Sequence, residues 1–353
     1  MKARQQMKEQ IINVGSLSSL SNLNYHLTKE LKILRESYLN GNGNIPIWDL
    51  TSLTPKKVSF AALTTFLSIS KVIRDFVGKP IEIKVQWHPE FQGFLSDIAF
   101  LKISKEFDLY DWKGMLGGFS SNKTSPNTRI FYYSDIPTFN YTDTNCIIDW
   151  KDIKREELKR SISFRLKPIF DNTYFINQWN KELEAIFTTT ISELVVNSLI
   201  HGRSIAFVGV QRTRKGITTC ICDSGIGFLN SLKKYKPELI DYLDNSNLKS
   251  ILYSSFHSKN KIGLYRAISD VIKSEGYINI SSFDSEILWK SKNWEYVDNN
   301  QTLEDVLKLR LEKSDYYING FVDIEKLDNG YFKKYDHFLM GSRITFEIPF
   351  SHD

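Results

Sequence analysis

Hydrophobic positions in the first 140 residues switch between two spacings, one typical of helices and the other of strands. Residues with helical spacing predict three helices, over 17–40, 58–77 and 89–104. Short alternating runs predict three strands, over 45–50, 80–87 and 128–136. Strands and helices that follow one another in this order indicate an α/β unit, so we assign residues 1–140 to a first domain.

The second half is assigned to another domain, residues 141–353, which begins within a polar, charged stretch at 137–165. A helix is expected over 175–201, ended by Gly202. Two strands follow as an antiparallel pair around the turn "RKG": "SIAFVGVQRT" and "GITTCICDSGIGF". The remaining expected elements are a helical pattern in 229–260, the helix "KIGLYRAISDVIKSEG", the strand "YINISSF", a hairpin-like stretch at 287–297, a polar helix near 302–312 and the strand "GSRITFEIPF".

The composition agrees with a soluble two-domain protein. The chain has 353 residues, of which 41% are hydrophobic and 25% charged. We expect neither a transmembrane helix nor a secretory signal, because no apolar run of sufficient length is present. Three cysteines, Cys146, Cys220 and Cys222, cannot form a disulfide framework, and a reducing cytoplasm is expected. Cys220 and Cys222 share one face of a strand without matching metal ligands, and we interpret both as buried small hydrophobic residues.

The charge pattern argues against a nucleic-acid partner. The net charge of +5 comes from 46 basic and 41 acidic residues, and the basic residues form short scattered groups, as in 151–160 and 231–236. Solvated helix faces explain these groups better than a nucleic-acid interface, which would need a dense basic stripe.

Glu193 and Asn197 place an acid and an amide one turn apart on the apolar helix "ISELVVNSLIHG". An amide oxygen is a ligand suited to magnesium, and a carboxylate can orient or deprotonate a water molecule. The alternative is a surface stripe on which Glu193 meets solvent, and the helix alone favours that alternative.

Asp223 opens the motif "DSGIGF" directly after a β-branched strand. A carboxylate in this place can accept a hydrogen bond from an exocyclic amine such as that of adenine. Gly225 and Gly227 allow the backbone to turn and to pass close to a ring or a phosphate. Most isolated motifs of this kind are simple turns, but the position after a strand and beyond Asn197 favours a binding site.

Lys259 and Lys261 precede the helix that opens at Gly263, in "HSKNKIGLYRAI". Free amides at a helix N-terminus, with lysines nearby, are suited to holding phosphates. An ordinary capped helix with solvated basic residues, His257 among them, is an equal alternative.

Together and in this order, the three motifs resemble those of the GHKL ATPase superfamily, over about residues 175–350. This superfamily includes gyrase-type topoisomerases, heat-shock chaperones, sensor histidine kinases and anti-sigma-factor kinases. The stretch "ELVVNSLIHG" is similar to the N-box of this superfamily, "DSGIGF" to its first glycine box and the shorter "KIGL" to its second. The last stretch, "GSRITFEIPF", is similar to the closing strand of these domains. The wording is closest to the anti-sigma-factor kinases. The resemblance implies a Bergerat-type α/β sandwich with a mixed sheet.

The resemblance also implies roles for particular residues. Asn197 would bind Mg²⁺, and Glu193 would be the general base. The implied nucleotide-binding residues are Asp223 toward the adenine amine, Gly225 and Gly227 beside the base, Gly263 and Leu264 holding the hinge of the lid against the phosphates, and Ser342 near the adenine in place of the usual threonine. Lys259 and Lys261 are added as phosphate-binding candidates because of their place before the helix. His201 is interpreted as a packing or capping residue.

Two departures from the family pattern bear on activity. Ile262 stands where family members usually have a further glycine, which puts efficient turnover in doubt more than nucleotide binding. Ile200 stands where histidine kinases often carry lysine, and no phospho-accepting histidine motif precedes it, so a sensor histidine kinase is not expected.

The implied function is a regulatory protein that binds ATP and Mg²⁺, with slow hydrolysis or phosphotransfer that closes a lid over 229–260. Alternatives are an anti-sigma-like serine kinase and a non-catalytic nucleotide-dependent interaction module. The expected partner is another protein or a second copy of the chain, and no membrane is expected.

The first half resembles a STAS-type α/β domain in "IWDLTSLTPKKVSFAALTTF" and in the strand and helix that follow. Phosphoregulated members carry a serine at the start of the helix, where Ser59 is the nearest candidate. The usual Asp-Ser-Ser-Gly wording is absent, and we therefore interpret Ser59 as a helix cap.

Overall fold

The structure is a computed structural model that describes residues 8–13, 17, 20–41, 43–51, 58–85, 89–112, 125–138, 144–174, 181–256, 263–291, 317–318, 321–322 and 332–350. The chain divides into two compact units, Met1–Phe131 with Phe207–Val210, and Tyr132–Ala206 with Gln211–Asp353. The fold is mixed α/β, with one parallel sheet and one sheet that contains antiparallel pairs. The predicted α/β class is thereby confirmed.

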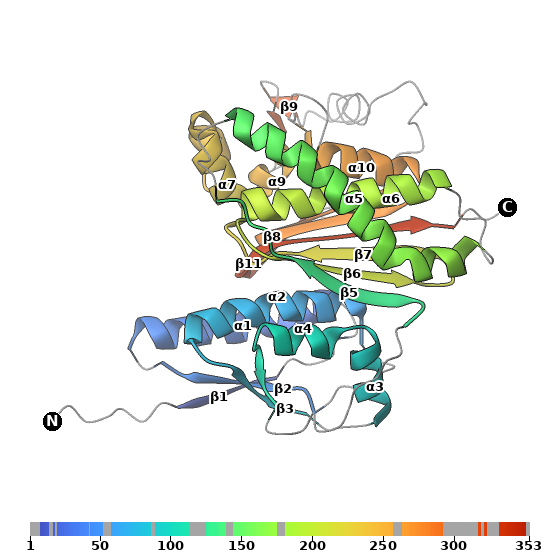
Figure 1. Cartoon of the computed structure of the whole chain (residues 1–353). Coiled ribbons are helices and arrows are strands. Elements are labelled where there is room, and N and C mark those ends of the chain that lie inside the picture. Colours follow the sequence, from blue (N-terminus) through green and yellow to red (C-terminus); the bar gives the residue numbers. More distant parts are fainter. Residues whose placement is uncertain are drawn as a thin grey trace. The chain divides into compact units, whose positions relative to one another are not determined.

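The first unit is built on a four-stranded parallel sheet (Figure 1). Its strands lie side by side in chain order: β1 (Glu9–Asn13), β2 (Ile45–Asp49), β3 (Ile81–Lys84) and β4 (Tyr110–Asp111). The connections contain the helices α1 (Leu20–Leu39), α2 (Phe60–Val77), α3 (Pro89–Asp97) and α4 (Phe100–Glu106). Parallel neighbours require such crossover helices, and the repeated strand–helix order thus accounts for the topology.

The helices predicted in this unit are confirmed, with one difference. The helix expected over 89–104 is two helices, because Ala99 takes a left-handed conformation with φ of 69° between them. Ser59 occupies the N-cap position of α2 with an extended backbone, but its hydroxyl group makes no capping hydrogen bond. The strands β1 and β4 were not predicted.

The second sheet has five strands. In order across the sheet they are β5 (Thr128–Tyr133), β6 (Ala206–Arg212), β7 (Gly216–Cys222), β11 (Phe332–Pro349) and β8 (Tyr277–Lys290). β11 runs antiparallel to both β7 and β8, and β7 is buried along its whole length, as expected for a central strand. The predicted strand over 128–136 exists as β5, but it belongs to this sheet and not to the first one. Its neighbour β6 follows more than 70 residues later, so local patterning could not reveal the pairing.

Several helices cover one face of this sheet (Figure 1). They are α5 (Thr144–Tyr174), α6 (Lys181–Asn197) with its π-helical extension η2 (Ser198–Gly202), α7 (Gly227–Tyr235), the 3₁₀ turn η3 (Pro237–Leu239), α8 (Ile240–Leu243), α9 (Asn247–Phe256) and α10 (Leu264–Lys273). α6 packs against α5 and α10, and α9 and α10 pack against β8. The small pair β9 (Tyr317–Ile318) and β10 (Phe321–Val322) completes the described elements. The polar helix expected near 302–312 lies outside the described residues.

The helix that holds Glu193 and Asn197 is a core helix. Residues 181–202 are long and apolar enough to span a membrane by length and composition, but 67% of their most apolar window is buried inside the structure. Apolar side chains occupy all sides of α6, which is the pattern of a helix enclosed by other elements. Its burial is thus accounted for by the packing of the protein itself.

Candidate functional site

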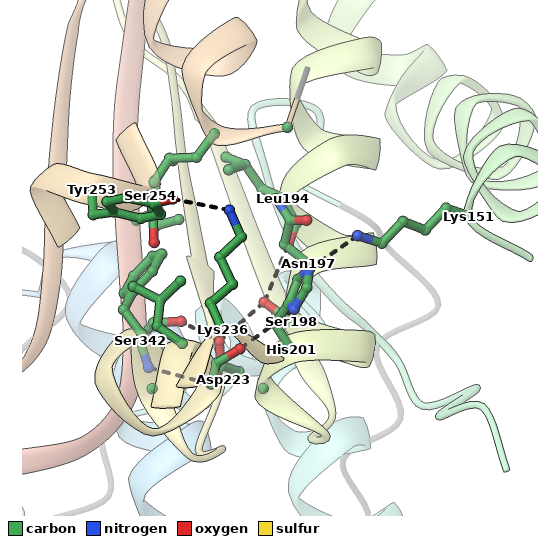
Figure 2. A pocket seen from close by; sticks show the side chains of 18 of the residues that line it. Lys151, Leu194, Asn197, Ser198, His201, Asp223, Lys236, Tyr253, Ser254 and Ser342 are labelled. Carbon is green, nitrogen blue, oxygen red and sulfur yellow. Dashed lines mark hydrogen bonds between the residues drawn. The ribbon is translucent and has the colours of Figure 1, made fainter. Parts of the chain in front are cut away.

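One cavity of about 270 Å³ lies in the second unit and collects residues that are far apart in the sequence (Figure 2). This volume is near the lower end of the range for ligand pockets. Six of the residues predicted from sequence line it: Asn197, Asp223, Gly227, Gly263, Leu264 and Ser342. The folded chain therefore brings the helix of Asn197, both predicted glycine motifs and the last strand to one place.

Asp223 is the most deeply buried of the polar residues that line the cavity, with only 2% of the residue exposed. Its Oδ1 atom accepts hydrogen bonds from the backbone N–H groups of Gly225 at 2.9 Å and Ser342 at 3.3 Å. Its Oδ2 atom accepts from the hydroxyl groups of Ser342 and Ser198, the latter at 3.1 Å. Despite these four hydrogen bonds, burial raises the pKa of Asp223 above its usual value. A further donor would stabilise its charged form.

Ser198 determines whether Asp223 can accept that further donor. A carboxylate has about four lone-pair sites, and the four donors present occupy them. The Ser198 hydroxyl oxygen also lies 3.2 Å from the carbonyl oxygen of Leu194, and a hydroxyl group has only one hydrogen to donate. When this hydrogen turns to Leu194, Oδ2 of Asp223 is left with capacity for a ligand N–H group.

Glycines allow the end of β7 to approach the end of η2. A Cβ atom at Gly225 would overlap the carbonyl oxygen of Gly202, and one at Gly202 would lie 3.1 Å from Oδ1 of Asp223. The helix was expected to end at Gly202, but the last turn includes this residue, and Arg203 takes the left-handed conformation instead, with φ of 52°. Close packing therefore explains Gly202 better than helix termination does.

Asn197 lines the cavity and lies opposite the start of α10. A Cβ atom at Gly263 would lie 3.7 Å from Nδ2 of Asn197, so the two predicted motifs face each other at van der Waals distance. Gly263 has φ of 71°, which a residue with a side chain would adopt only with strain. Within the described part of the chain, the carboxamide of Asn197 makes no hydrogen bond and stays available to a ligand.

Glu193 is buried and forms an ion pair with α5. It is 3% exposed, which excludes the alternative that it meets solvent. Its Oε1 atom forms a close ion pair with Nε of Arg155 on α5, and its Oε2 atom is buried without a hydrogen-bond partner among the residues described. Arg155 also contacts Asp152 at 2.5 Å. Glu193 is one turn from Asn197, but it is not part of the cavity lining.

The basic residues of the lining come from positions that the motifs did not indicate. Lys151 reaches the cavity from α5, and Lys236 reaches it from the segment between α7 and η3 (Figure 2). Arg155, also on α5, lines it as well. Nζ of Lys236 donates a hydrogen bond to the Tyr253 hydroxyl group at 3.0 Å and lies 4.9 Å from the centre of the ring. The region expected to form a lid, 229–260, thus contributes a cation and an aromatic ring to the cavity.

His201 has a partner that was not predicted. Its Nε2 atom lies 3.0 Å from Nζ of Lys151, and its Nδ1 atom lies 3.4 Å from the hydroxyl group of Ser231. Burial, together with the charge of Lys151, lowers the pKa of His201 to about 3. The imidazole is therefore neutral at neutral pH and can accept a hydrogen bond from the lysine.

Other predictions have mixed outcomes. Cys220 and Cys222 are buried, as expected, whereas Cys146 is exposed. Lys259 and Lys261 lie outside the described residues, together with His257 and Ile262, and their assignment to the phosphates stays a prediction. Within the described residues, no group of three His, Cys, Asp or Glu side chains is placed to hold a metal ion.

Comparisons with protein-family models, with curated proteins and with solved structures found no match to this chain.

Proposed function

We propose that the second unit binds ATP together with Mg²⁺ and that binding acts as a regulatory switch. The observation that carries the proposal is the convergence of Asn197, Asp223, Gly263 and Ser342 on one cavity. Asp223 supplies a buried acceptor for the adenine amine, and Asn197 supplies an unused amide oxygen, a hard ligand of the kind that Mg²⁺ prefers. The GHKL resemblance, with its Bergerat-type sandwich, is part of this proposal.

The charges of the lining support a polyphosphate ligand. Among the described residues, three cationic side chains, Lys151, Arg155 and Lys236, line the cavity with a single carboxylate, that of Asp223. A bound magnesium ion would neutralise part of the phosphate charge and fix the orientation of the phosphates. The aromatic and basic residues of 229–256 that reach the cavity would contact the ligand, so that closure of this segment would alter the surface offered to a protein partner.

Slow turnover is the expected behaviour of this site. Hydrolysis would require water to attack the γ-phosphorus while its bond to the bridging oxygen breaks and ADP leaves, with a base accepting the proton of the water; Glu193 is the predicted base. Its carboxylate is paired with Arg155 and does not line the cavity, so Glu193 would have to move to reach a water molecule there. The same ion pair favours a second candidate function, a nucleotide-dependent interaction module without catalysis.

Calorimetry with ATP, ADP and adenosine, each with Mg²⁺ and with a chelator, tests the proposal directly. We expect all three ligands to bind, with Mg²⁺ strengthening the binding of ATP most. In Asn197→Ala, binding with chelator should be unchanged, but the gain from Mg²⁺ should fall by about tenfold, the effect of losing one hydrogen-bonding or ligand group. Asn230→Ala, an exposed residue of α7, is the matched control. A wild-type protein that binds no adenine compound would overturn the proposal.

Glu193→Gln separates the two candidate functions. If Glu193 orients or deprotonates water, phosphate release should fall by roughly 100-fold or more, while the affinity for ATP should change by less than about twofold. The measurements are the release of labelled phosphate and the calorimetric affinity for ATP, each compared between wild type and Glu193→Gln. Release that persists in Glu193→Gln removes the catalytic assignment. Binding without any release in the wild type supports the interaction module.

A further inference from the structure

Two cations of α5 face the N-box helix across the cavity wall. Lys151 and Arg155 are one turn apart, and their partners His201 and Glu193 are two turns apart on α6 and η2, with Asn197 between them. Arg155 has carboxylate partners in Glu193 and Asp152. Lys151 forms no ion pair within the part of the chain that the structure describes.

The imidazole of His201 holds Lys151 without neutralising its charge. Because His201 is neutral, its Nε2 atom accepts one N–H of the ammonium group, and its Nδ1–H is directed to Ser231. Two N–H donors of Lys151 remain for another acceptor. His201 therefore fixes the position of a charge that has no ion-pair partner among the described residues.

The surroundings of Lys151 favour an anion at this point. Burial and the neighbouring charge of Arg155 lower the pKa of Lys151 to about 8, and the carboxylates of Glu193 and Asp152 offset this only in part. A group of negative charge in the cavity would stabilise the ammonium form. Since Lys151 lines the cavity beside Asn197 and His201 (Figure 2), the anion would be bound next to the proposed magnesium ligand.

We infer that Lys151 binds phosphoryl oxygens of a polyphosphate ligand and that His201 acts as its positioning residue. This inference rests on the proposed function and adds to it the group that recognises the phosphates. Lys151, on a neighbouring helix, would also provide the positive charge that histidine kinases often have as a lysine at the position of Ile200. Lys151 is 46 residues upstream of Asn197, outside all three motifs.

Lys151→Met tests the assignment, because methionine keeps the length of the side chain and removes its charge. We expect the affinities for tripolyphosphate and for a non-hydrolysable ATP analogue to fall by roughly 10- to 100-fold, the range for a hydrogen bond to a charged group. Adenosine should bind within about twofold of wild type, since it has no phosphate. Lys167→Met, on the exposed side of the same helix, is the matched control and should change none of these affinities.

The pH dependence gives a second readout. Tripolyphosphate affinity in the wild type should be fully present below about pH 8 and should fall as the pH rises through the pKa of Lys151. Lys151→Arg should bind tripolyphosphate without this fall, because arginine stays charged. His201→Phe removes the acceptor and should weaken tripolyphosphate binding several-fold, whereas His201→Gln retains an acceptor and should restore most of it.

The ligands distinguish failure of this inference from failure of the proposed function. If Lys151→Met binds tripolyphosphate as tightly as wild type does, the inference is wrong even though ATP binds. It is also wrong if the affinity for adenosine falls by as large a factor as the affinity for tripolyphosphate. If tripolyphosphate binds through Lys151 but adenosine does not bind, the inference stands and the proposed adenine site is wrong. If the wild type binds neither ligand, both are overturned.

Discussion

Asp223→Asn should weaken the binding of adenosine and of ATP by roughly 100-fold or more, because a site built to accept a hydrogen bond rejects the ligand when the acceptor becomes a donor. The carboxamide would keep one oxygen for the backbone N–H groups of Gly225 and Ser342. Its NH₂ group would stand where Oδ2 now faces Ser198 and Ser342. An amine of adenine would then meet a donor instead of an acceptor.

The substitution should leave the fold intact. Hydroxyl groups can accept as well as donate, so Ser198 and Ser342 can turn to accept from the new NH₂ group. Burial already disfavours the charged carboxylate, as the raised pKa of Asp223 indicates, and a neutral amide avoids that cost. Thermal unfolding should therefore show a much smaller effect than calorimetry does.

The same variant should alter base preference. Inosine triphosphate has a carbonyl oxygen in place of the adenine amine, and the Asn NH₂ group could donate to it. The ratio of ATP to ITP affinity should fall by at least about tenfold in Asp223→Asn. Asp241→Asn, at an exposed position of α8, makes the same chemical change outside the cavity and should leave the ratio unchanged. An unchanged ratio in Asp223→Asn would show that Asp223 does not recognise the base.

Elements with a strong local pattern could be predicted, whereas those defined by distant partners could not. The helix α2, the strand β7 and the first half of β8 have apolar patterns that identify them in isolation, whereas β8 continues to Lys290, where the start of a hairpin-like stretch was expected. β4 has only two residues, and β1 shows no strict alternation of apolar and polar residues, so that pairing with β3 and β2 defines them. Propensity over a few residues carries too little information for such strands.

The helix α5 was missed although a signal was present. Its charged residues dominate the composition of 151–160, but the fully buried positions Leu158, Ile162, Leu166 and Ile169 recur at spacings of four, four and three. This is the spacing of one helical face. Reading these positions separately from the charges around them would have revealed the helix.

The site could be predicted in part. The motif order placed Asn197, Asp223 and Gly263 together, because each motif combines a chemical group with a fixed place at the end of an element. The partners on α5 were beyond that reasoning, since no pattern links Lys151 to His201 or Arg155 to Glu193 across the intervening residues. Helix packing alone creates those contacts, and it changes the interpretation of Glu193 from a free base to a member of an ion pair.

Gly225→Ala should destabilise the second unit by about 2–4 kcal/mol, through overlap that neither chain segment can relieve by turning a side chain. The added Cβ atom would overlap the carbonyl oxygen of Gly202 and lie 2.5 Å from its carbonyl carbon. It would also disturb the hydrogen bond from Ile226 N–H to the Gly202 carbonyl at 3.2 Å. Because Asp223 precedes this turn, nucleotide binding should be lost with the local packing.

Substitutions of two other glycines should change the stability less than Gly225→Ala does, or in the opposite direction. Gly202→Ala would meet the Asp223 side chain at 3.1 Å, which a small shift can relieve, so its cost should be lower than that of Gly225→Ala. Gly93→Ala, within α3, has open space around the new atom and should stabilise by up to about 1 kcal/mol, since alanine favours helices more than glycine does.

Urea unfolding, combined with hydrogen exchange of peptides from 181–202 and 216–235, measures where each substitution acts. Gly225→Ala should raise exchange in both regions, because the end of η2 and the end of β7 must separate to admit the methyl group. Gly93→Ala should raise exchange in neither. If Gly225→Ala has the same exchange rates and stability as the wild type, the backbone of Gly202 can move away without a cost in free energy. The position of Asp223 would then not depend on the close approach of these two segments.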